Sequence, residues 1–341
     1  MRHRIALIGL GMAVTPHAKS LLDLADRVQV AYAWSPSAER RAAFAARFPF
    51  PQAANLEAIL SDASVGAVAI LTPPATHLDL VRRCAAAGKH VLLEKPLEIT
   101  TPRAEALVSA CREARVTLGV VLQHRFRPSA LRLAAMLRAG ELGALIAAST
   151  GIRLWRPQSY YDEPGRGTLA RDGGGVLLTQ GIHTLDLLQS LAGPVTEVTG
   201  YATTSAVHRM ETEDLVCAAA RFAGGAFGTI EATTAAFPGF PERIDLIGDR
   251  ATASLSGVDL VVHGHDGRVT ELRPQTGGGG TGADPMDFPH DTHRALLGDF
   301  LDAIEQGRDP AASGSEVLRV HRLIDALLQA AQTGRPQPVL A

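Results

Sequence analysis

The chain is poor in cysteine, in aromatic residues and in net charge, and it lacks long apolar runs. Its three cysteines, Cys84, Cys111 and Cys217, stand far apart without metal-ligand spacing, which favours small buried thiols in a reducing cytoplasm. A formal net charge of −2 and the absence of a basic tract argue against nucleic acid as a partner. Since no apolar run reaches the roughly 18 residues that span a bilayer, a membrane partner is not expected either.

What the chain does contain is enough apolar sequence for a large core. It is 46% hydrophobic over 341 residues, which favours about two domains. Its start, with Arg2 and Arg4 before an apolar run to Val14, is similar to a short secretory signal. Because Gly9 and Gly11 interrupt that run and no small-residue cleavage pattern follows, we interpret it as a buried first strand.

Short apolar runs alternate with helical patterns in the first third of the chain. Strands are expected at residues 5–8, 28–33, 68–71, 90–93 and 117–122, and helices at 17–24, 37–48, 76–87 and 102–114. Continuous apolar strands separated by helices are typical of a sheet covered on both faces. Residues 1–123 are therefore predicted to form an α/β domain with a doubly wound parallel sheet of the Rossmann type.

Longer strand patterns with alternating polarity dominate after residue 145. Strands are expected at residues 147–152, 195–204, 215–222, 226–234, 243–247, 251–255 and 258–262. Helices are expected at 177–191, 292–306 and 315–333, the last one capped by Ser315. Residues 124–341 are thus predicted to form an α+β domain with a large, mostly antiparallel open sheet, and the glycine-rich stretch 275–283 a loop.

Two glycines mark the turn between the first strand and the first helix. Gly9-Leu10-Gly11 stands where a dinucleotide pyrophosphate lies on a helix N-terminus, and glycine there permits close backbone approach. The third position of the Gly-x-Gly-x-x-Gly motif is Val14, so the motif is incomplete. With Met12 and Ala13 in the same turn, the segment predicts a cofactor-binding loop. The alternative is an ordinary strand–turn–helix.

The end of the second strand bears on the choice of nicotinamide cofactor. An NAD-preferring site usually places an acidic side chain there for the ribose 2′-hydroxyl, and none stands between Ala33 and Ser37. Ser35 and Ser37 offer hydrogen bonds, while Arg40 and Arg41 offer positive charge. This composition favours NADP, with NAD as the second choice. The alternative is that the arginines only form a solvated helix face.

Several segments in a fixed order extend over nearly the whole chain. They are Gly9-Leu-Gly11 with His17, Thr72-Pro73-Pro74 with His77, Gly88-Lys-His-Val-Leu-Leu-Glu94-Lys95-Pro96, Gly173-Gly-Gly175, His183 with Asp186, and Asp299-Phe-Leu-Asp-Ala-Ile304. Together they resemble the glucose–fructose oxidoreductase, inositol dehydrogenase and rhizopine-catabolism (Gfo/Idh/MocA) family. The resemblance implies a nicotinamide-dependent oxidoreductase. It also implies that Thr72, Pro73, His77, Glu94, Lys95 and Gln123 contribute to the cofactor site.

Lys95 is the principal catalytic candidate by this resemblance. The family's lysine lies beside the nicotinamide, where an ammonium at the end of a strand binds the substrate hydroxyl and stabilises developing alkoxide charge. The alternative, a surface lysine after a strand, is disfavoured by the flanking Glu94 and Pro96. The resemblance also favours a cis Lys95–Pro96 bond.

His183 is the second catalytic candidate, as general acid and base. The family places a glycine-rich turn, an acidic residue and then a histidine four residues on, and histidine suits proton transfer near neutral pH. Here Thr179 stands where many members carry Asp, so the Lys–Asp–His relay is incomplete, although its hydroxyl can bind substrate. Asp186 shares a helix face with His183 and is predicted to orient it, to bind substrate or to be a structural acid.

Further substrate candidates lie after the last strand of the first domain and after the first strand of the second. They are Arg125, Arg153, Trp155, Arg156, Tyr160 and Tyr161. Rings cover C–H faces and guanidinium groups bind hydroxyls, which suits a polyhydroxylated ligand, the alternative being rim or interface packing. His290 and His293 also suggest a metal, but no matching ligand cluster is evident in the sequence and no metal is predicted.

The sequence thus predicts hydride transfer between nicotinamide and a secondary alcohol or ketone of a sugar, cyclitol or related polyol. Two other functions stay open. One is a cofactor-binding sensor without turnover, which Thr179 makes conceivable, and the other is an NAD-dependent glycoside hydrolase or lyase with transient oxidation. The family resemblance alone predicts a homodimer or homotetramer.

Overall fold

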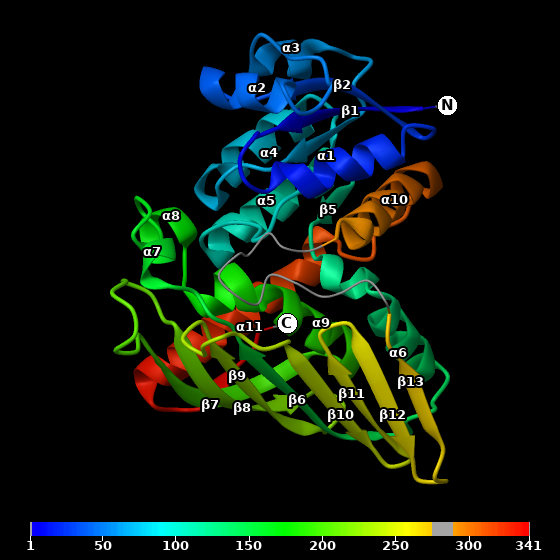
Figure 1. The fold of residues 1–341 in the computed structure, drawn as a ribbon, viewed down its shortest axis with the longest axis vertical. Helices are drawn as coiled ribbons and strands as arrows, with labels where there is room; N and C mark the ends of the chain where they lie inside the picture. The colour runs from blue at the N-terminus through cyan, green and yellow to red at the C-terminus, as the bar shows by residue number, and fades with distance from the viewer. Residues whose placement is uncertain (1, 275–288, 341) are drawn as a thin grey trace. The chain divides into compact units, whose positions relative to one another are not determined.

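The structure, a computed structural model, describes residues 2–274 and 289–340 and divides into two compact units (Figure 1). Unit 1 comprises Met1–Leu122 and His290–Leu318, and unit 2 comprises Gln123–Pro289 and Arg319–Ala341. The sequence-based boundary after residue 123 lies beside this division. However, residues 290–318, which the sequence analysis assigned to the second domain, belong to unit 1. The expected loop 275–283 lies outside the described residues.

Unit 1 is built on a parallel sheet, as its continuous apolar runs predict. Among the described residues, five strands lie in the order β2-β1-β3-β4-β5, and all their pairings are parallel. The strands are β1 (His3–Ile8), β2 (Val28–Trp34), β3 (Ala67–Ile70), β4 (His90–Leu93) and β5 (Leu118–Val120). Every residue of β3 is buried, which requires cover on both faces of the sheet.

Helices connect these strands and supply that cover. They are α1 (Val14–Asp23), α2 (Ala38–Ala45), α3 (Leu56–Ser61), η1 (Pro74–Thr76), α4 (His77–Ala86) and α5 (Thr101–Glu113). The much later helix α10 (Asp291–Gln306) packs against α1, and Figure 1 shows its orange ribbon beside the blue one. A Cβ added to Gly119 in β5 would lie 2.9 Å from the ring of Phe300, so this glycine lets α10 approach the sheet.

Unit 2 contains the large open sheet that the alternating patterns predict. Its described strands lie in the order β13-β12-β11-β10-β6-β9-β8-β7-β14, and β6 with β9 is the parallel pair in an otherwise antiparallel arrangement. The strands are β6 (Leu145–Arg153), β7 (Val195–Thr203), β8 (Leu215–Phe222), β9 (Phe227–Thr233), β10 (Arg243–Gly248), β11 (Ala251–Ser256), β12 (Asp259–Gly264), β13 (Val269–Leu272) and β14 (Gln337–Pro338).

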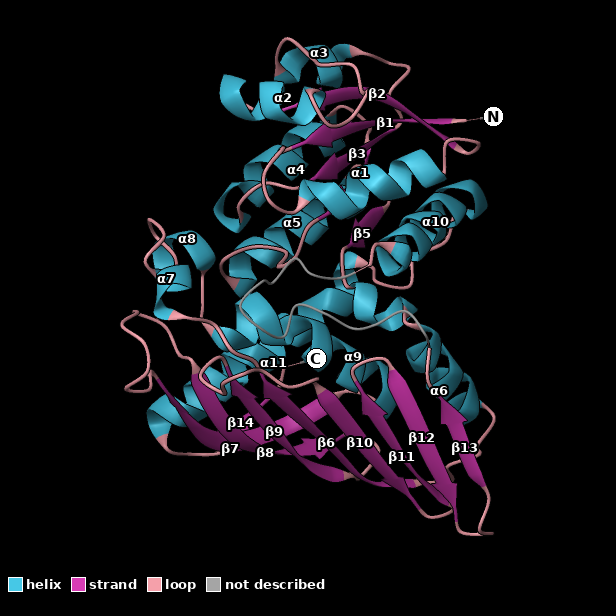
Figure 2. Cartoon of the chain, in the orientation of Figure 1, coloured by secondary structure: helices cyan, strands magenta, loops and turns pink. Residues whose placement is uncertain are grey.

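The longer helices of unit 2 lie on one side of this sheet, and α6 and α9 contact it (Figure 2). The described helices are η2 (Gln123–Phe126), α6 (Pro128–Arg138), α7 (Gln158–Tyr161), α8 (Leu169–Asp172), η3 (Leu177–Gly181), α9 (Ile182–Ala192) and α11 (Gly314–Thr333), whose first residues belong to unit 1. α9 contacts β6 and β10, while α6 contacts β11 and β12. The opposite face carries exposed side chains, among them Cys217, Ala219 and Phe227.

Two expectations about local structure need correction. The start of α11 is not capped by Ser315, because the hydroxyl of Ser313 accepts the N–H of Glu316 and bonds the Ser315 hydroxyl. Helix α6 was not expected from the sequence, nor were the shorter elements η1, α3, η2, α7, α8, β13 and β14. Within the described part of the chain, no helix has the length and apolar character that crossing a membrane requires.

Candidate active site

The phosphate loop lies where β1 ends and α1 begins, as predicted. Gly9 has a φ of +101°, and an added Cβ would lie 2.7 Å from the carbonyl carbon of Leu71, so the turn needs glycine. Val14, at the motif's third position, is the buried first residue of α1. Ala13 precedes it without a capping side chain, beside the exposed Met12, which leaves the first N–H groups of the helix to an anion. This cradle fits a dinucleotide pyrophosphate.

The polar side chains after β2 are less accessible than the sequence suggests. Ser35 is buried, and the hydroxyl of Ser37 caps α2 by accepting the N–H of Arg40 at 3.2 Å. Arg41 donates to the carbonyl of Ser35 and thereby fixes the turn. A Cβ on Gly11 would lie 3.7 Å from Nη1 of Arg40, which places this guanidinium at the phosphate loop. Arg40 is therefore the strongest of the four candidates for a 2′-phosphate.

His77, which was expected to contribute to the cofactor site, is a buried cross-link between two loops. Its Nε2 lies 2.8 Å from the carbonyl oxygen of Thr72, and its Nδ1 lies 3.1 Å from those of Pro96 and Leu97. Burial lowers the pKa of His77, although the carbonyl groups oppose this shift. Because His77 is fully buried, it cannot contact a cofactor from solvent. It acts instead by holding together the loops that follow β3 and β4.

The turn that carries Lys95 follows β4 directly and is anchored by the carboxylate of Glu94. Oε1 of Glu94 accepts from His17 Nε2 at 3.0 Å, and Oε2 accepts the backbone N–H of Lys95 at 3.0 Å. Burial alone would raise the pKa of Glu94, but the His17 hydrogen bond and the nearby charge of Lys95 outweigh it and hold this pKa below its usual range. The Lys95–Pro96 bond is cis, as expected.

His293, on α10, completes this cluster in unit 1. Its ring meets that of His17 edge to face, with 5.1 Å between the centroids. Burial, with His17 beside it, lowers the pKa of His293 to about 3, so the ring is neutral at ordinary pH. Possible metal-ligand atoms of His17, Glu94 and His293 lie within 4.8 Å of one another, a grouping that the sequence did not reveal, while His290 binds Asp23. Since Glu94 already accepts two N–H groups, hydrogen bonding accounts for the arrangement.

In unit 2, the glycine turn before the His183 helix packs against a buried acidic residue. Glu213 accepts the N–H groups of Gly175 and Leu177 with its carboxylate and that of Val176 with its carbonyl. A Cβ added to Gly175 would lie 1.8 Å from that carbonyl oxygen, so the close approach needs glycine. Burial raises the pKa of Glu213, although the N–H groups oppose the shift. Glu213 thus fixes the start of the helix that carries His183.

His183 lies in the first turn of α9, directly after the π-helical turn η3. The Thr179 hydroxyl lies 2.7 Å from the carbonyl oxygen of Gly175, one turn earlier, and also contacts the side-chain oxygen of Gln180. A hydroxyl bonded in this way supplies neither a base nor a charge to His183. The His183 ring stacks on the ring of His124, with 4.8 Å between centroids and 30° between planes.

Two of the expected substrate ligands bind each other. Arg125 forms a two-pronged ion pair with Asp186, with 2.7 Å from Nε to Oδ2 and 2.6 Å from Nη2 to Oδ1. The side chain of Asp186 is 2% exposed. Of the three roles considered for Asp186, a structural acid describes this geometry best. Gln123 begins η2, the turn that carries Arg125.

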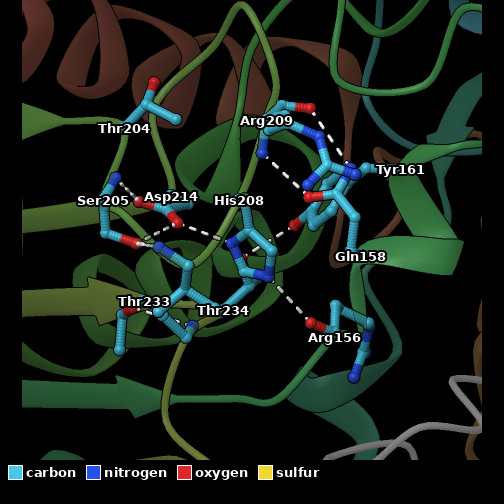
Figure 3. Close-up of polar contacts among 12 residues, drawn as sticks. Arg156, Gln158, Tyr161, Thr204, Ser205, His208, Arg209, Asp214, Thr233 and Thr234 are labelled. Carbon is cyan, nitrogen blue, oxygen red and sulfur yellow. Dashed lines mark hydrogen bonds and ion pairs between the residues drawn. The ribbon is translucent and has the colours of Figure 1, made fainter.

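A buried polar network joins the backbone at Arg156 to the loop before β8 (Figure 3). His208 Nδ1 lies 2.6 Å from Asp214 Oδ2, and its Nε2 lies 2.8 Å from the carbonyl oxygen of Arg156. Ser205 donates both its N–H and its hydroxyl to the carboxylate of Asp214. The serine therefore binds the acid and not the imidazole, which is not the order of a Ser–His–Asp nucleophile. Nothing in the local sequence predicted this network.

The aromatic candidates surround this network. Trp155 lies 6.2 Å from the ring of His208, and Tyr160 lies 4.4 Å below the guanidinium of Arg166. Tyr161 is buried and bonds the hydroxyl of Thr234 at 2.8 Å. These contacts favour a positioning role for Tyr161, whereas the residues Trp155 and Tyr160 are half-buried.

Arg153 does not join the other substrate candidates. It forms an ion pair with Glu231 on β9, and both side chains lie on the exposed face of the sheet. The preceding residue, Ile152, faces Gly181 next to α9. Because successive side chains of a strand point to opposite faces, Arg153 lies on the face away from α9 and His183.

A parallel-sheet unit with a pyrophosphate cradle, joined to a unit with a large open sheet, defines a class of nicotinamide-dependent oxidoreductase. The chain matches the oxidoreductase family with an NAD-binding Rossmann fold over residues 3–122 and the GFO/IDH/MocA C-terminal domain over residues 130–254. The chain belongs to this Gfo/Idh/MocA family. The fold class and the family expected from the sequence are confirmed.

Named relatives and solved structures agree with this assignment. A 1,5-anhydro-D-fructose reductase of Ensifer adhaerens is 30% identical over 88% of each chain, and an inositol 2-dehydrogenase of Rhizobium meliloti is 26% identical over 96% of this chain and 97% of its own. The WlbA dehydrogenase of Bordetella pertussis, solved with NADH and UDP-GlcNAcA, covers 100% of both chains with 27% identity and a TM-score of 0.85.

The neutral state of buried His293 predicts a loss of stability in acid. The unfolded chain protonates this histidine below about pH 6.5, whereas the folded chain does not until about pH 3. The free energy of unfolding therefore falls as the pH drops below 6.5, by up to about 1.4 kcal/mol per pH unit for this residue. In urea unfolding between pH 6.5 and 5, His293→Gln should show a shallower pH slope than the wild type. The exposed His265→Gln should retain the wild-type slope, and equal slopes in all three proteins would contradict a neutral His293.

Proposed function

We propose that this protein is an NAD(P)-dependent dehydrogenase or reductase for a secondary alcohol or ketone of a sugar, cyclitol or related polyol. The observation that carries the proposal is the anchored turn of Lys95, which lies in the same unit as the phosphate loop. The relatives named as a xylose dehydrogenase, an inositol dehydrogenase and an anhydrofructose reductase support this substrate class.

The chemistry divides between the cofactor and two side chains. When bound, the nicotinamide cofactor supplies or accepts the hydride. The ammonium of Lys95 binds the substrate oxygen and stabilises the negative charge that develops on it. His183 accepts the hydroxyl proton during oxidation and returns it during reduction.

The remaining roles follow the placement of the other candidates. Cofactor contacts are assigned to Gly9, Gly11, Met12, Ala13, Arg40, Thr72, Pro73 and Gln123. Substrate contacts are assigned to Trp155, Tyr160 and the hydroxyl oxygen of Thr179. The buried Glu94 and His77 act on the cofactor site through the loops that they hold.

Turnover assays test the proposal directly. We expect purified protein to change the absorbance of reduced nicotinamide with at least one member of a panel of sugars, cyclitols and their keto forms. Lys95→Met should retain cofactor binding but lose turnover by about a hundredfold or more, since it removes charge stabilisation of the reacting oxygen. The exposed Lys19→Met, on α1, is the matched control and should behave as wild type.

Other outcomes of this assay select other functions. Tight cofactor binding without turnover on the whole panel would favour a sensor. Release of a glycosidic leaving group with no net change in cofactor would favour a hydrolase or lyase with transient oxidation. Full activity of Lys95→Met would remove Lys95 from the mechanism.

We further propose that NADP is the preferred cofactor, with Arg40 as the residue that binds its 2′-phosphate. The guanidinium lies at the phosphate loop, and the segment from Ala33 to Ser37 has no carboxylate that would repel the phosphate. In calorimetric titrations we expect NADP to bind about tenfold or more tightly than NAD, as one charge-assisted contact would give. Arg40→Ala should abolish this difference, and the exposed Arg82→Ala on α4 should not. A clear preference for NAD would refute the assignment.

We also propose that the protein forms a homodimer or a larger assembly of dimers through the exposed face of the unit 2 sheet. Short side chains at its centre, such as Ser149, Ala219 and Thr229, are flanked by the exposed rings of Tyr201 and Phe227. An exposed face with short side chains at its centre and aromatic rings beside them suits a second copy of itself. The free thiols of Cys84 and Cys111 support a cytoplasmic location.

The oligomer is tested by substitution at the centre of that face. Light scattering should give at least twice the chain mass for the wild type and a smaller mass for Ala219→Arg, because a buried guanidinium would lack a partner. The matched control is Ala46→Arg, an exposed site in unit 1, which should leave the mass unchanged. A monomeric wild type, or an Ala219→Arg protein of wild-type mass, would exclude this interface.

A further inference from the structure

His124 occupies an unusual position beside the proposed acid–base residue. It lies in η2, far from His183 in the chain, yet the two imidazole rings stack with 4.8 Å between centroids and 30° between planes. Both residues belong to unit 2. Stacked rings restrain each other, because rotating either ring away loses the shared contact area.

The second ring of the pair is itself held in place. Arg127 Nη2 lies 2.7 Å from His124 Nε2, and the same guanidinium binds the carboxylate of Glu242 at 3.0 Å and the carbonyl of Gly257 at 3.0 Å. Arginine can only donate, so Nε2 of His124 accepts in this contact and carries no proton. His124 is therefore a neutral ring whose Nε2 edge lies at the Arg127–Glu242 ion pair, 3.5 Å from Oε1 of Glu242.

Two polar side chains of the same helical segment, Thr179 and Asp186, have hydrogen-bond partners of their own. The Thr179 hydroxyl bonds the carbonyl oxygen of Gly175. The carboxylate of Asp186 accepts two hydrogen bonds from the guanidinium of Arg125. The fourth residue before His183, where the family pattern has an acid, thus supplies no charge. The clamped ring of His124 is a contact that restrains the orientation of the His183 imidazole.

We propose that His124 is a positioning residue for His183, whose ring it fixes by stacking while adding no charge of its own. The inference rests on the proposed function of His183 in proton transfer. The physical basis of this restraint is contact between two imidazole rings. A general acid and base must hold its geometry closely, since small misplacements lower the rate of proton transfer.

Two substitutions separate the ring from the hydrogen bond. His124→Gln keeps an acceptor for Arg127 but removes the ring, whereas His124→Phe keeps the ring and removes the acceptor. His263→Gln, at an exposed site on β12, is the matched control. Thermal unfolding of each variant, together with the wild type, establishes that all are folded before the comparison.

The first measurement needs no turnover. Diethylpyrocarbonate modifies accessible imidazole nitrogens, and peptide mass spectrometry gives the rate at His183 alone. We expect this rate to rise about three- to tenfold in His124→Gln, as loss of one ring contact predicts, and to stay near the wild-type rate in His124→Phe and His263→Gln. A His183 rate in His124→Gln equal to that of the wild type would overturn the proposal, as would a His124→Phe protein that behaves like His124→Gln.

The second measurement uses the substrate found in the turnover assay. His124→Gln should lower kcat about three- to tenfold and leave KM within about twofold, and His124→Phe should restore kcat. A rise in KM without a fall in kcat would instead make His124 a substrate ligand and overturn the positioning role. If no variant turns over any substrate while the modification rates still differ as expected, the proposed function fails and the ring contact stands.

Discussion

A buried carboxylate that accepts backbone N–H groups is the interaction on which the position of each proposed catalytic side chain depends. In unit 1 it belongs to Glu94, which receives one hydrogen bond from His17 on α1 and one from the N–H of Lys95. Removing a carboxylate from water is costly unless its oxygens are bonded. Moving the Lys95 turn would break one of these bonds inside the protein, so the turn stays where β4 ends.

The same physical device recurs in unit 2 with a different residue. Glu213 receives the N–H groups that begin the His183 helix, and the next residue, Asp214, receives Ser205 and faces His208. Glu213 thus holds the glycine turn. Its neighbour Asp214 holds the backbone at Arg156 through the imidazole of His208. Their burial makes them poor substrate ligands and good supports. The family's glycine-rich turn works here because Gly175 allows the backbone of Glu213 to approach.

The accuracy of the sequence-based prediction varied with how local each signal was. β1, β3 and β4 were found because strands covered on both faces are apolar at every position. β13 was missed because its residues are exposed or half-exposed at the edge of the sheet, which leaves no apolar pattern. α6 was missed although it buries Ala130, Leu133 and Met136 at helical spacing, with proline at its first position. Greater weight on that spacing would have found it.

The sequence by itself determined the fold class, the phosphate loop, the Lys95 turn and the family, because each depends on a short motif or on the periodicity of apolar residues. Only the tertiary structure decided which side chains meet. In it Arg125 pairs with Asp186, and Arg153 lies on the sheet face opposite to α9. Helix α10 packs against α1, and the ring of His124 stacks on that of His183. These contacts join residues that are distant in the chain, and their partners are selected by packing and burial, which no local pattern encodes.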